Sequence, residues 1–100
     1  MHLSPEIFYK HCYGKYAIPA VNVFTMEQVL GLFSSGERAK APFIVQITPA
    51  ARNYAGPEML IAMIKAAAKI FPKTVYAVHM DHGNEEHAFD AILSNDYQSV

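Results

Sequence analysis

The sequence predicts an α/β fold, namely the N-terminal part of a (β/α)8 TIM barrel with about three β-α units after an N-terminal helix. Short apolar runs alternate with longer segments of helical periodicity, a pattern typical of a parallel sheet flanked by helices. The last run, residues 98–100, reads as the onset of a fourth strand. Because a complete barrel needs about 250 residues, we expect residues 1–100 to be the N-terminal fragment of a single barrel domain.

The first elements each have a local signal. An N-terminal helix is expected, with three side chains on its inner side: Phe8, His11 and Cys12. A strand is expected over Ala17–Phe24, with pairing only after Pro19, because proline cannot donate to a ladder. Thr25 can cap the next helix, and Gln28 can complete a capping box. Gly36 should interrupt this helix or mark its fraying end.

The later elements follow the same order. Phe43–Thr48 is expected to be the second strand, with a loop over Pro49–Gly56. Pro57 suits the first position of a helix, whose predicted apolar stripe is Leu60, Met63, Ile64, Ala67 and Ile70. Thr74–Met80 is the third predicted strand. Asn84 can cap the next helix, whose predicted inner face is Ala88, Ala91 and Ile92.

The amino-acid composition indicates a globular protein. The chain is 52% hydrophobic and 17% charged, with net charge −1, which suits a globular core. This balance favours neither nucleic acid nor a membrane as a partner. One cysteine and no secretory signal favour the cytoplasm. Arg52 and Lys40 are interpreted as surface charges.

Polar side chains stand at the carboxyl end of each predicted strand, where parallel α/β folds bind ligands. Asn22 closes the first strand, Thr48 the second, and Asp81 with His82 the third. A ring nitrogen of His82 can bind Zn²⁺, and the Asp81 carboxylate can exchange a proton with a substrate held there. The alternative interpretation is a polar turn capped by Asn84.

Two neighbouring histidines are given structural interpretations. His79 should share a face with Asp81 and be hydrogen-bonded in the barrel interior, while His87 should be solvated.

Three segments, YAIPAVNVFTMEQ, APFIVQITPAARNYAG and VHMDHG, occur in this order. Together they resemble the class II (metal-dependent) fructose-bisphosphate aldolases, from about Tyr13 to the end of the chain. The Asp81-His82-Gly83 tripeptide is the most specific part. Thr48-Pro49-Ala50 departs from the Ser-Glu-Gly type of segment usual in the family.

This resemblance implies a zinc-dependent, reversible cleavage of fructose 1,6-bisphosphate to dihydroxyacetone phosphate and glyceraldehyde 3-phosphate, a reaction of glycolysis and gluconeogenesis. His82 would be one zinc ligand, and Asp81 the acid/base residue at the C4 hydroxyl. Thr48 and Asn22 would contact the substrate. The resemblance also implies a dimer or tetramer, and it places the remaining zinc ligands, the phosphate-binding loops and a monovalent-cation site beyond residue 100. The 100-residue piece alone should therefore be inactive.

Two alternatives remain open. A tagatose-bisphosphate aldolase of the same family would use the same residues. A non-catalytic fragment could instead associate with other chains through an exposed sheet edge.

Overall fold

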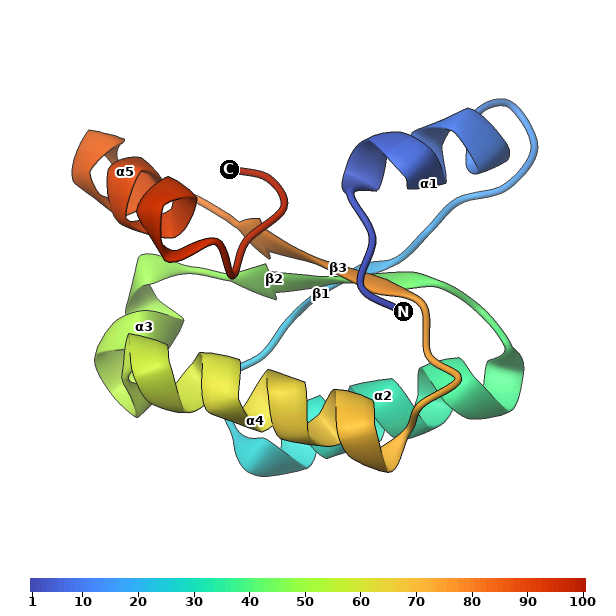
Figure 1. The fold of residues 1–100 in the computed structure, drawn as a ribbon, viewed down its shortest axis with the longest axis horizontal. Coiled ribbons are helices and arrows are strands. Elements are labelled where there is room, and N and C mark those ends of the chain that lie inside the picture. The colour runs from blue at the N-terminus through green and yellow to red at the C-terminus, as the bar shows by residue number, and fades with distance from the viewer.

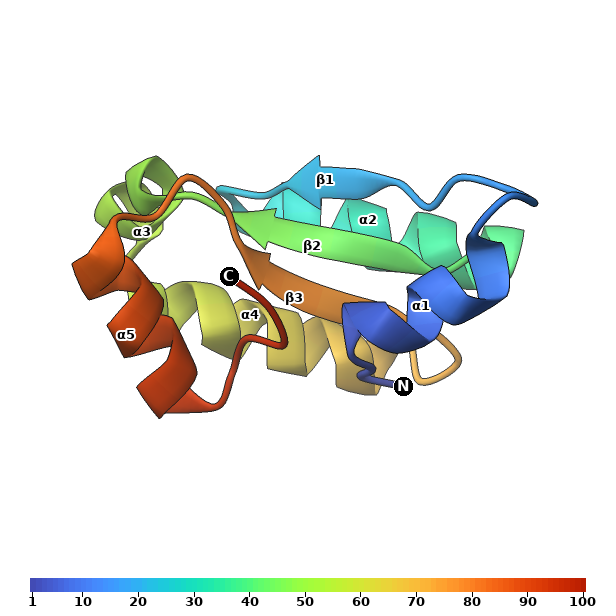
Figure 2. The same ribbon diagram turned by 90° about the horizontal axis from the view of Figure 1, so that it is seen from above.

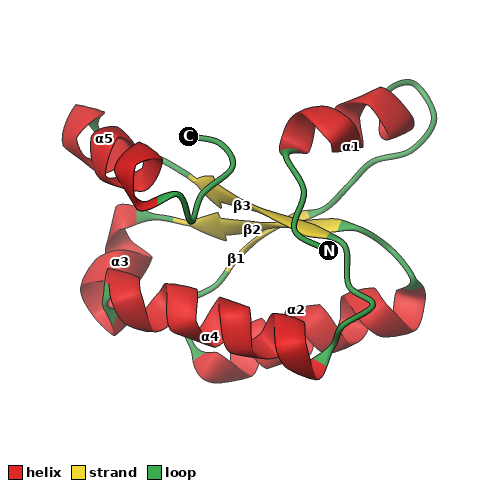
Figure 3. Ribbon diagram, viewed as in Figure 1, coloured by secondary structure: helices red, strands yellow, loops and turns green.

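The computed structural model describes residues 1–100 and contains a three-stranded parallel sheet between helices (Figure 1). The strands, in the sheet order β1-β2-β3, are β1 (Ala20–Asn22), β2 (Phe43–Ile47) and β3 (Tyr76–Met80). The helices are α1 (Pro5–Cys12), α2 (Met26–Ala39), α3 (Pro49–Ala55), α4 (Pro57–Ile70) and α5 (Glu85–Ser94). Figure 3 shows helices between successive strands, so the predicted α/β alternation is confirmed.

The way the chain winds identifies the architecture. The helices α2 and α4 connect successive strands and lie side by side on one face of the sheet (Figures 1 and 2). Strands that join a sheet in sequence order, with their crossovers on one face, are singly wound, as in a (β/α)8 barrel; a doubly wound fold reverses its strand order. The predicted partial barrel is therefore confirmed, and the face opposite α2 and α4 is the barrel interior.

Whether a residue number is even or odd decides on which face of the sheet its side chain lies, because side chains alternate along a strand. The helix-facing side belongs to one apolar core, made of Val23, Val29, Phe33, Phe43, Val45, Ile47, Ala51, Leu60, Ile61, Ile64, Ala67, Tyr76 and Val78. On the interior side, Phe8 of α1 packs against Ile44 and Ala77, near the start of the strands. Since side chains alternate along a strand, the interior side takes even residue numbers in β1 and β2 and odd numbers in β3.

The start of α2 follows its predicted capping box. Thr25 Oγ1 accepts from the backbone N–H of Gln28 at 3.2 Å, and Gln28 Oε1 accepts from the Thr25 N–H at 3.3 Å. The strand before it is shorter than predicted, Ala20–Asn22 rather than Ala17–Phe24. Pairing begins at Pro19, whose carbonyl accepts from Ile44 N–H at 2.9 Å. It ends early because the N–H of Phe24 donates to Gln28 Oε1 at 2.8 Å instead of a neighbouring strand.

The loop predicted over residues 49–56 is wrong, because most of this segment forms α3. Thr48 caps it, accepting at Oγ1 from the backbone N–H of Ala51 at 3.2 Å, and Pro49 takes the first helical turn. Ala51 is the one buried residue of this seven-residue helix. A helix that buries one small side chain has no apolar stripe for a periodicity argument to detect.

Gly36 does not interrupt α2, which continues to Ala39. A Cβ at this position would lie 2.6 Å from Cδ1 of the Phe43 ring, and closer still to its Cε1. The glycine therefore lets helix α2 approach β2 across a buried aromatic ring.

Three residues predicted to face inward are exposed, although their helices are correct. Ile70 is 60% exposed at the last position of α4, and Ile92 is 60% exposed while its neighbour Ala91 is fully buried. One residue along a helix turns the side chain by about 100°, which carries Ile92 away from β3. His11 is exposed, whereas Phe8 and Cys12 on the same helix are buried.

Residues 98–99 begin to pair with β3, as predicted for a fourth strand. Gln98 N–H donates to Val78 O at 2.9 Å, and Met80 N–H donates to Ser99 O at 3.0 Å. None of the five helices combines the length and apolar composition that crossing a bilayer requires.

Candidate functional site

The structure brings the predicted site residues to one edge of the sheet. Asn22 is the last residue of β1, Thr48 follows β2, and Asp81 follows β3. The N–H of Asp81 donates to the carbonyl of Ile47, the last residue of β2, at 2.9 Å, so the β2–β3 ladder continues one residue beyond the end of β3. Asp81 is thereby held beside Thr48 by backbone hydrogen bonding, rather than left on a free loop.

The Asp81 carboxylate lies between two imidazoles. Its Oδ2 is 3.5 Å from His82 Nε2, and its Oδ1 is 3.9 Å from His79 Nε2. The side chains of His79 and Asp81 are 26% and 23% exposed, whereas that of His82 is 82% exposed. The other ring nitrogen of His79, Nδ1, is hydrogen-bonded to Ser99 Oγ at 2.8 Å, which holds the ring in place. The result is a partly buried carboxylate held next to an imidazole that reaches into solvent.

The turn after β3 places the backbone of His82 in an unfavourable conformation. His82 has φ 54°, in the left-handed region, which costs a non-glycine residue about 1–3 kcal/mol. Gly83 follows because a Cβ there would lie 3.0 Å from His87 Cβ and 3.1 Å from Met80 Cγ. Strain of this kind clusters at functional sites.

The first turn of α5 completes this local structure. Asn84 Oδ1 accepts from His87 N–H at 2.9 Å, and His87 Nδ1 accepts from Asn84 N–H at 3.2 Å. The prediction of a capping Asn84 is confirmed. His87 remains partly exposed in the first turn of the helix, and its ring also closes the capping box, a contact that was not predicted.

The donor chemistry at this edge suits one metal ligand. The exposed imidazole of His82 is a ligand type that divalent zinc accepts, and the Asp81 carboxylate stands next to it. No group of three or more histidine, cysteine, aspartate or glutamate side chains converges on one point in residues 1–100. A catalytic zinc site takes three protein ligands, so these residues would supply only part of such a site.

The two predicted substrate contacts differ in their surroundings. The Thr48 hydroxyl accepts the N-cap hydrogen bond of α3, which leaves its O–H free to donate to a ligand. Asn22 is exposed at the end of β1, which is the edge strand of the sheet.

Sequence reasoning missed Gln46, which lies between the candidate residues. It pairs in register with Asn22 on one side and His79 on the other. The alternation of side chains along the strand could have revealed it. In FIVQI, Gln46 is a polar residue on the face opposite to Val45 and Ile47, which belong to the apolar core.

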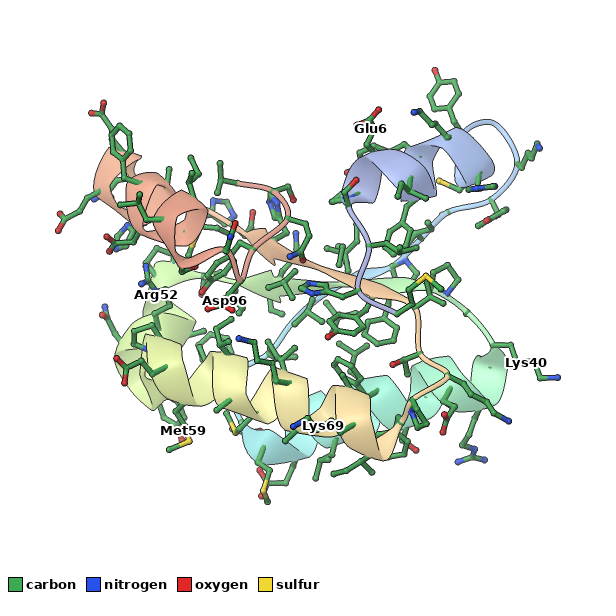
Figure 4. All side chains as sticks on the ribbon, in the orientation of Figure 1. Glu6, Lys40, Arg52, Met59, Lys69 and Asp96 are labelled. Carbon is green, nitrogen blue, oxygen red and sulfur yellow. The ribbon has the colours of Figure 1, made fainter.

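A hollow of about 450 Å³, apart from the candidate site, lies between α4 and α5. Four of its charged groups form two pairs: Arg52 Nη2 lies 3.9 Å from Asp90 Oδ2, and Lys65 Nζ lies 2.6 Å from Asp96 Oδ1. Figure 4 shows Arg52 beside α5, whereas Lys40 extends into solvent. The prediction of a surface Arg52 is wrong, because its side chain is only 15% exposed.

Comparison with known proteins points to one family. Residues 4–100 match the family model described as fructose-bisphosphate aldolase class-II. The chain is 38% identical over 85 residues to fructose-bisphosphate aldolase 2 of Cereibacter sphaeroides, covering 85% of this chain and 24% of that protein. It is 35% identical over 85 residues to fructose-bisphosphate aldolase of Nostoc sp. strain PCC 7120, with the same two coverages.

Solved structures show the same fold. The YdjI aldolase of Escherichia coli K12 superimposes with a TM-score of 0.81 at 22% identity, covering 94% of this chain and 37% of that one. The chain spans about a quarter of the length of the curated relatives that it matches, 24% in both cases above.

Proposed function

Because the chain belongs to the class-II fructose-bisphosphate aldolase family, we propose that the full-length protein cleaves fructose 1,6-bisphosphate reversibly to dihydroxyacetone phosphate and glyceraldehyde 3-phosphate. Residues 1–100 form the N-terminal part of its barrel domain and contribute one side of the active site. The 100-residue chain alone lacks a complete set of metal ligands, so we expect it to be inactive by itself.

The position of the Asp81 carboxylate carries this proposal. It stands at the carboxyl edge of a singly wound parallel sheet, where barrel enzymes place their catalytic groups. Its side chain is 23% exposed, so a substrate can reach it, while the ladder hydrogen bond to Ile47 keeps its backbone in place. Held this way, a carboxylate is suited to general acid–base work.

Each residue of the edge then has a role. Asp81 takes the proton from the C4 hydroxyl during cleavage and returns it during condensation. His82 contributes one ligand to a divalent metal ion, which when bound supplies Lewis-acid polarisation of the substrate carbonyl. Thr48 and Asn22 hydrogen-bond the substrate and orient it toward Asp81. Aldol cleavage by this route needs no Schiff-base lysine.

The test is a cleavage assay on the full-length protein before and after a chelator, with zinc added back. Fructose 1,6-bisphosphate and tagatose 1,6-bisphosphate are compared as substrates. We expect activity that the chelator removes and zinc restores, with a higher kcat/KM for the fructose compound. Activity insensitive to the chelator would overturn metal dependence, and a preference for the tagatose compound would reassign the substrate.

The exposed edge of β1 supports a second, non-catalytic candidate. All three residues of β1 are exposed, and no strand pairs with its outer side. An unpaired edge is a template for association. Sedimentation of the 100-residue chain tests this candidate: a monomer at micromolar concentration would argue against it.

A further inference from the structure

Three polar side chains form a row across the interior face of the sheet. Asn22, Gln46 and His79 are paired in register on three adjacent strands, so their Cα atoms are about 4.8 Å apart. One level below, Ile44 and Ala77 are apolar and are sealed by Phe8 of α1. This interior row is therefore the first polar level above the closed end of the barrel.

The row lies directly under the proposed catalytic edge. Thr48 and Asp81 are two residues further along β2 and β3 than Gln46 and His79, a rise of about 6.6 Å. Side chains two residues apart on a strand share a face. A ligand that reaches Asp81 from the interior therefore has the interior row beneath it.

Gln46 is the central member of the row, and its amide is free. None of the side-chain hydrogen bonds of the structure involves Gln46. It is half-buried, with buried apolar residues on either side of it in β2. Its amide atoms are not among the buried, unpartnered polar atoms, which are Arg52 Nε and Tyr97 Oη, so the amide is open to solvent on the interior side. A branched apolar residue would suit this strand position better. Such a local conflict between residue and position is expected at functional sites.

We propose that Gln46 binds a hydroxyl or carbonyl oxygen of the substrate's carbon chain at the floor of the active site, between Asn22 and His79. This assignment rests on the proposed aldolase function. The row carries two amides and an imidazole, groups that both donate and accept hydrogen bonds, as a hydroxyl does. It holds no lysine or arginine, the side chains that suit a phosphate group. The interior row therefore recognises the neutral carbon chain, and the phosphate groups bind elsewhere.

The test compares two glutamine-to-methionine substitutions in the full-length protein. Gln46→Met keeps the length of the side chain and removes its hydrogen-bonding groups. We expect it to lower kcat/KM for the ketose bisphosphate by about tenfold to a hundredfold, without lowering the unfolding temperature. The inhibition constant of inorganic phosphate, which reports on the phosphate sites alone, should stay within about twofold. Gln28→Met, which removes the capping box of α2, should lower the unfolding temperature and leave kcat/KM unchanged.

The outcomes separate this inference from the function on which it rests. If the unsubstituted protein cleaves neither bisphosphate, the proposed function fails. If it cleaves one and Gln46→Met matches it in kcat/KM, the role of Gln46 is wrong. The role is also wrong if phosphate inhibition weakens in parallel with kcat/KM, or if the unfolding temperature falls with it. Should Gln46→Met fail to fold, Gln46→Glu is measured instead: it keeps the size but replaces the amide donor with a second acceptor oxygen, and unchanged kcat/KM would overturn the proposal.

Discussion

Replacing Gly36 by alanine tests the close packing of α2 on β2. The new Cβ would meet Cδ1 of Phe43 at 2.6 Å, well inside van der Waals contact. Phe43 cannot easily move aside: it is 2% exposed, and its ring centroid lies 5.0 Å from that of Phe33 and 6.1 Å from that of Tyr76. Overpacking of a core costs about 1–3 kcal/mol, and a contact with several fixed rings falls at the upper end.

The same substitution also improves helix propensity by about 1 kcal/mol, so Gly36→Ala should lose about 2 kcal/mol net. Gly31 in the same helix is the matched control, because a Cβ there would have nothing within 4 Å. Gly31→Ala should gain about 0.5–1 kcal/mol.

The assay is urea unfolding of the 100-residue chain, followed by far-ultraviolet circular dichroism. With a slope of about 1–3 kcal/mol per molar urea, the two midpoints should differ by about 1–3 M. A Gly36→Ala chain at least as stable as the parent would refute the packing described for Phe43, whatever the control does.

Four further predictions concern the candidate site and its supports. In the full-length protein, Asp81→Ala should abolish cleavage and leave zinc bound, and a cleavage assay with metal analysis tests this; unchanged turnover would remove its assigned role. His82→Ala should sharply lower the zinc content measured after dialysis, and full retention of zinc would argue against it as a ligand. Asn84→Ala removes the cap of α5 and should cost about 1 kcal/mol in urea unfolding, a loss that Asn84→Asp should largely avoid. Burial lowers the pKa of His2 below its ordinary 6.5, outweighing the hydrogen bond that raises it, and the ring stacks on Tyr76. The unfolded chain therefore binds the proton more tightly, so the free energy of unfolding should fall as the pH drops from about 6.5 through the folded-state pKa. His2→Phe should remove this part of the slope, and an identical slope in that variant would contradict the assignment.

Local signals predicted most of the secondary structure correctly. Capping residues such as Thr25 and Asn84 bond to backbone groups three residues away, so their effect can be read from adjacent sequence. The same holds for Pro57 at the start of α4. α3 was missed because a short helix that buries only Ala51 has no stripe to detect.

The candidate site was likewise predicted in part from the sequence. The order of strands and helices was enough to place Asn22, Thr48 and Asp81 at one edge, since parallel strands all end on the same side of a sheet. The prediction that His79 shares a face with Asp81 and is hydrogen-bonded inside the barrel is confirmed, whereas its partner, Ser99, was not predicted. The Asp81 carboxylate lies between His79 and His82, and the His79 ring also contacts Ser99, which is 20 residues further along the chain.

The sequence by itself determined the alternation of strands and helices, the positions of the main caps and the group of residues at the carboxyl edge. These depend on periodicity and on contacts within a few residues. Only the tertiary structure decided why Gly36 stands in α2, why Arg52 is mostly covered and why Gln46 joins the interior row. Each depends on the register between segments that are distant in sequence, because the side chain opposite a residue is chosen by packing and strand pairing rather than by its neighbours along the chain.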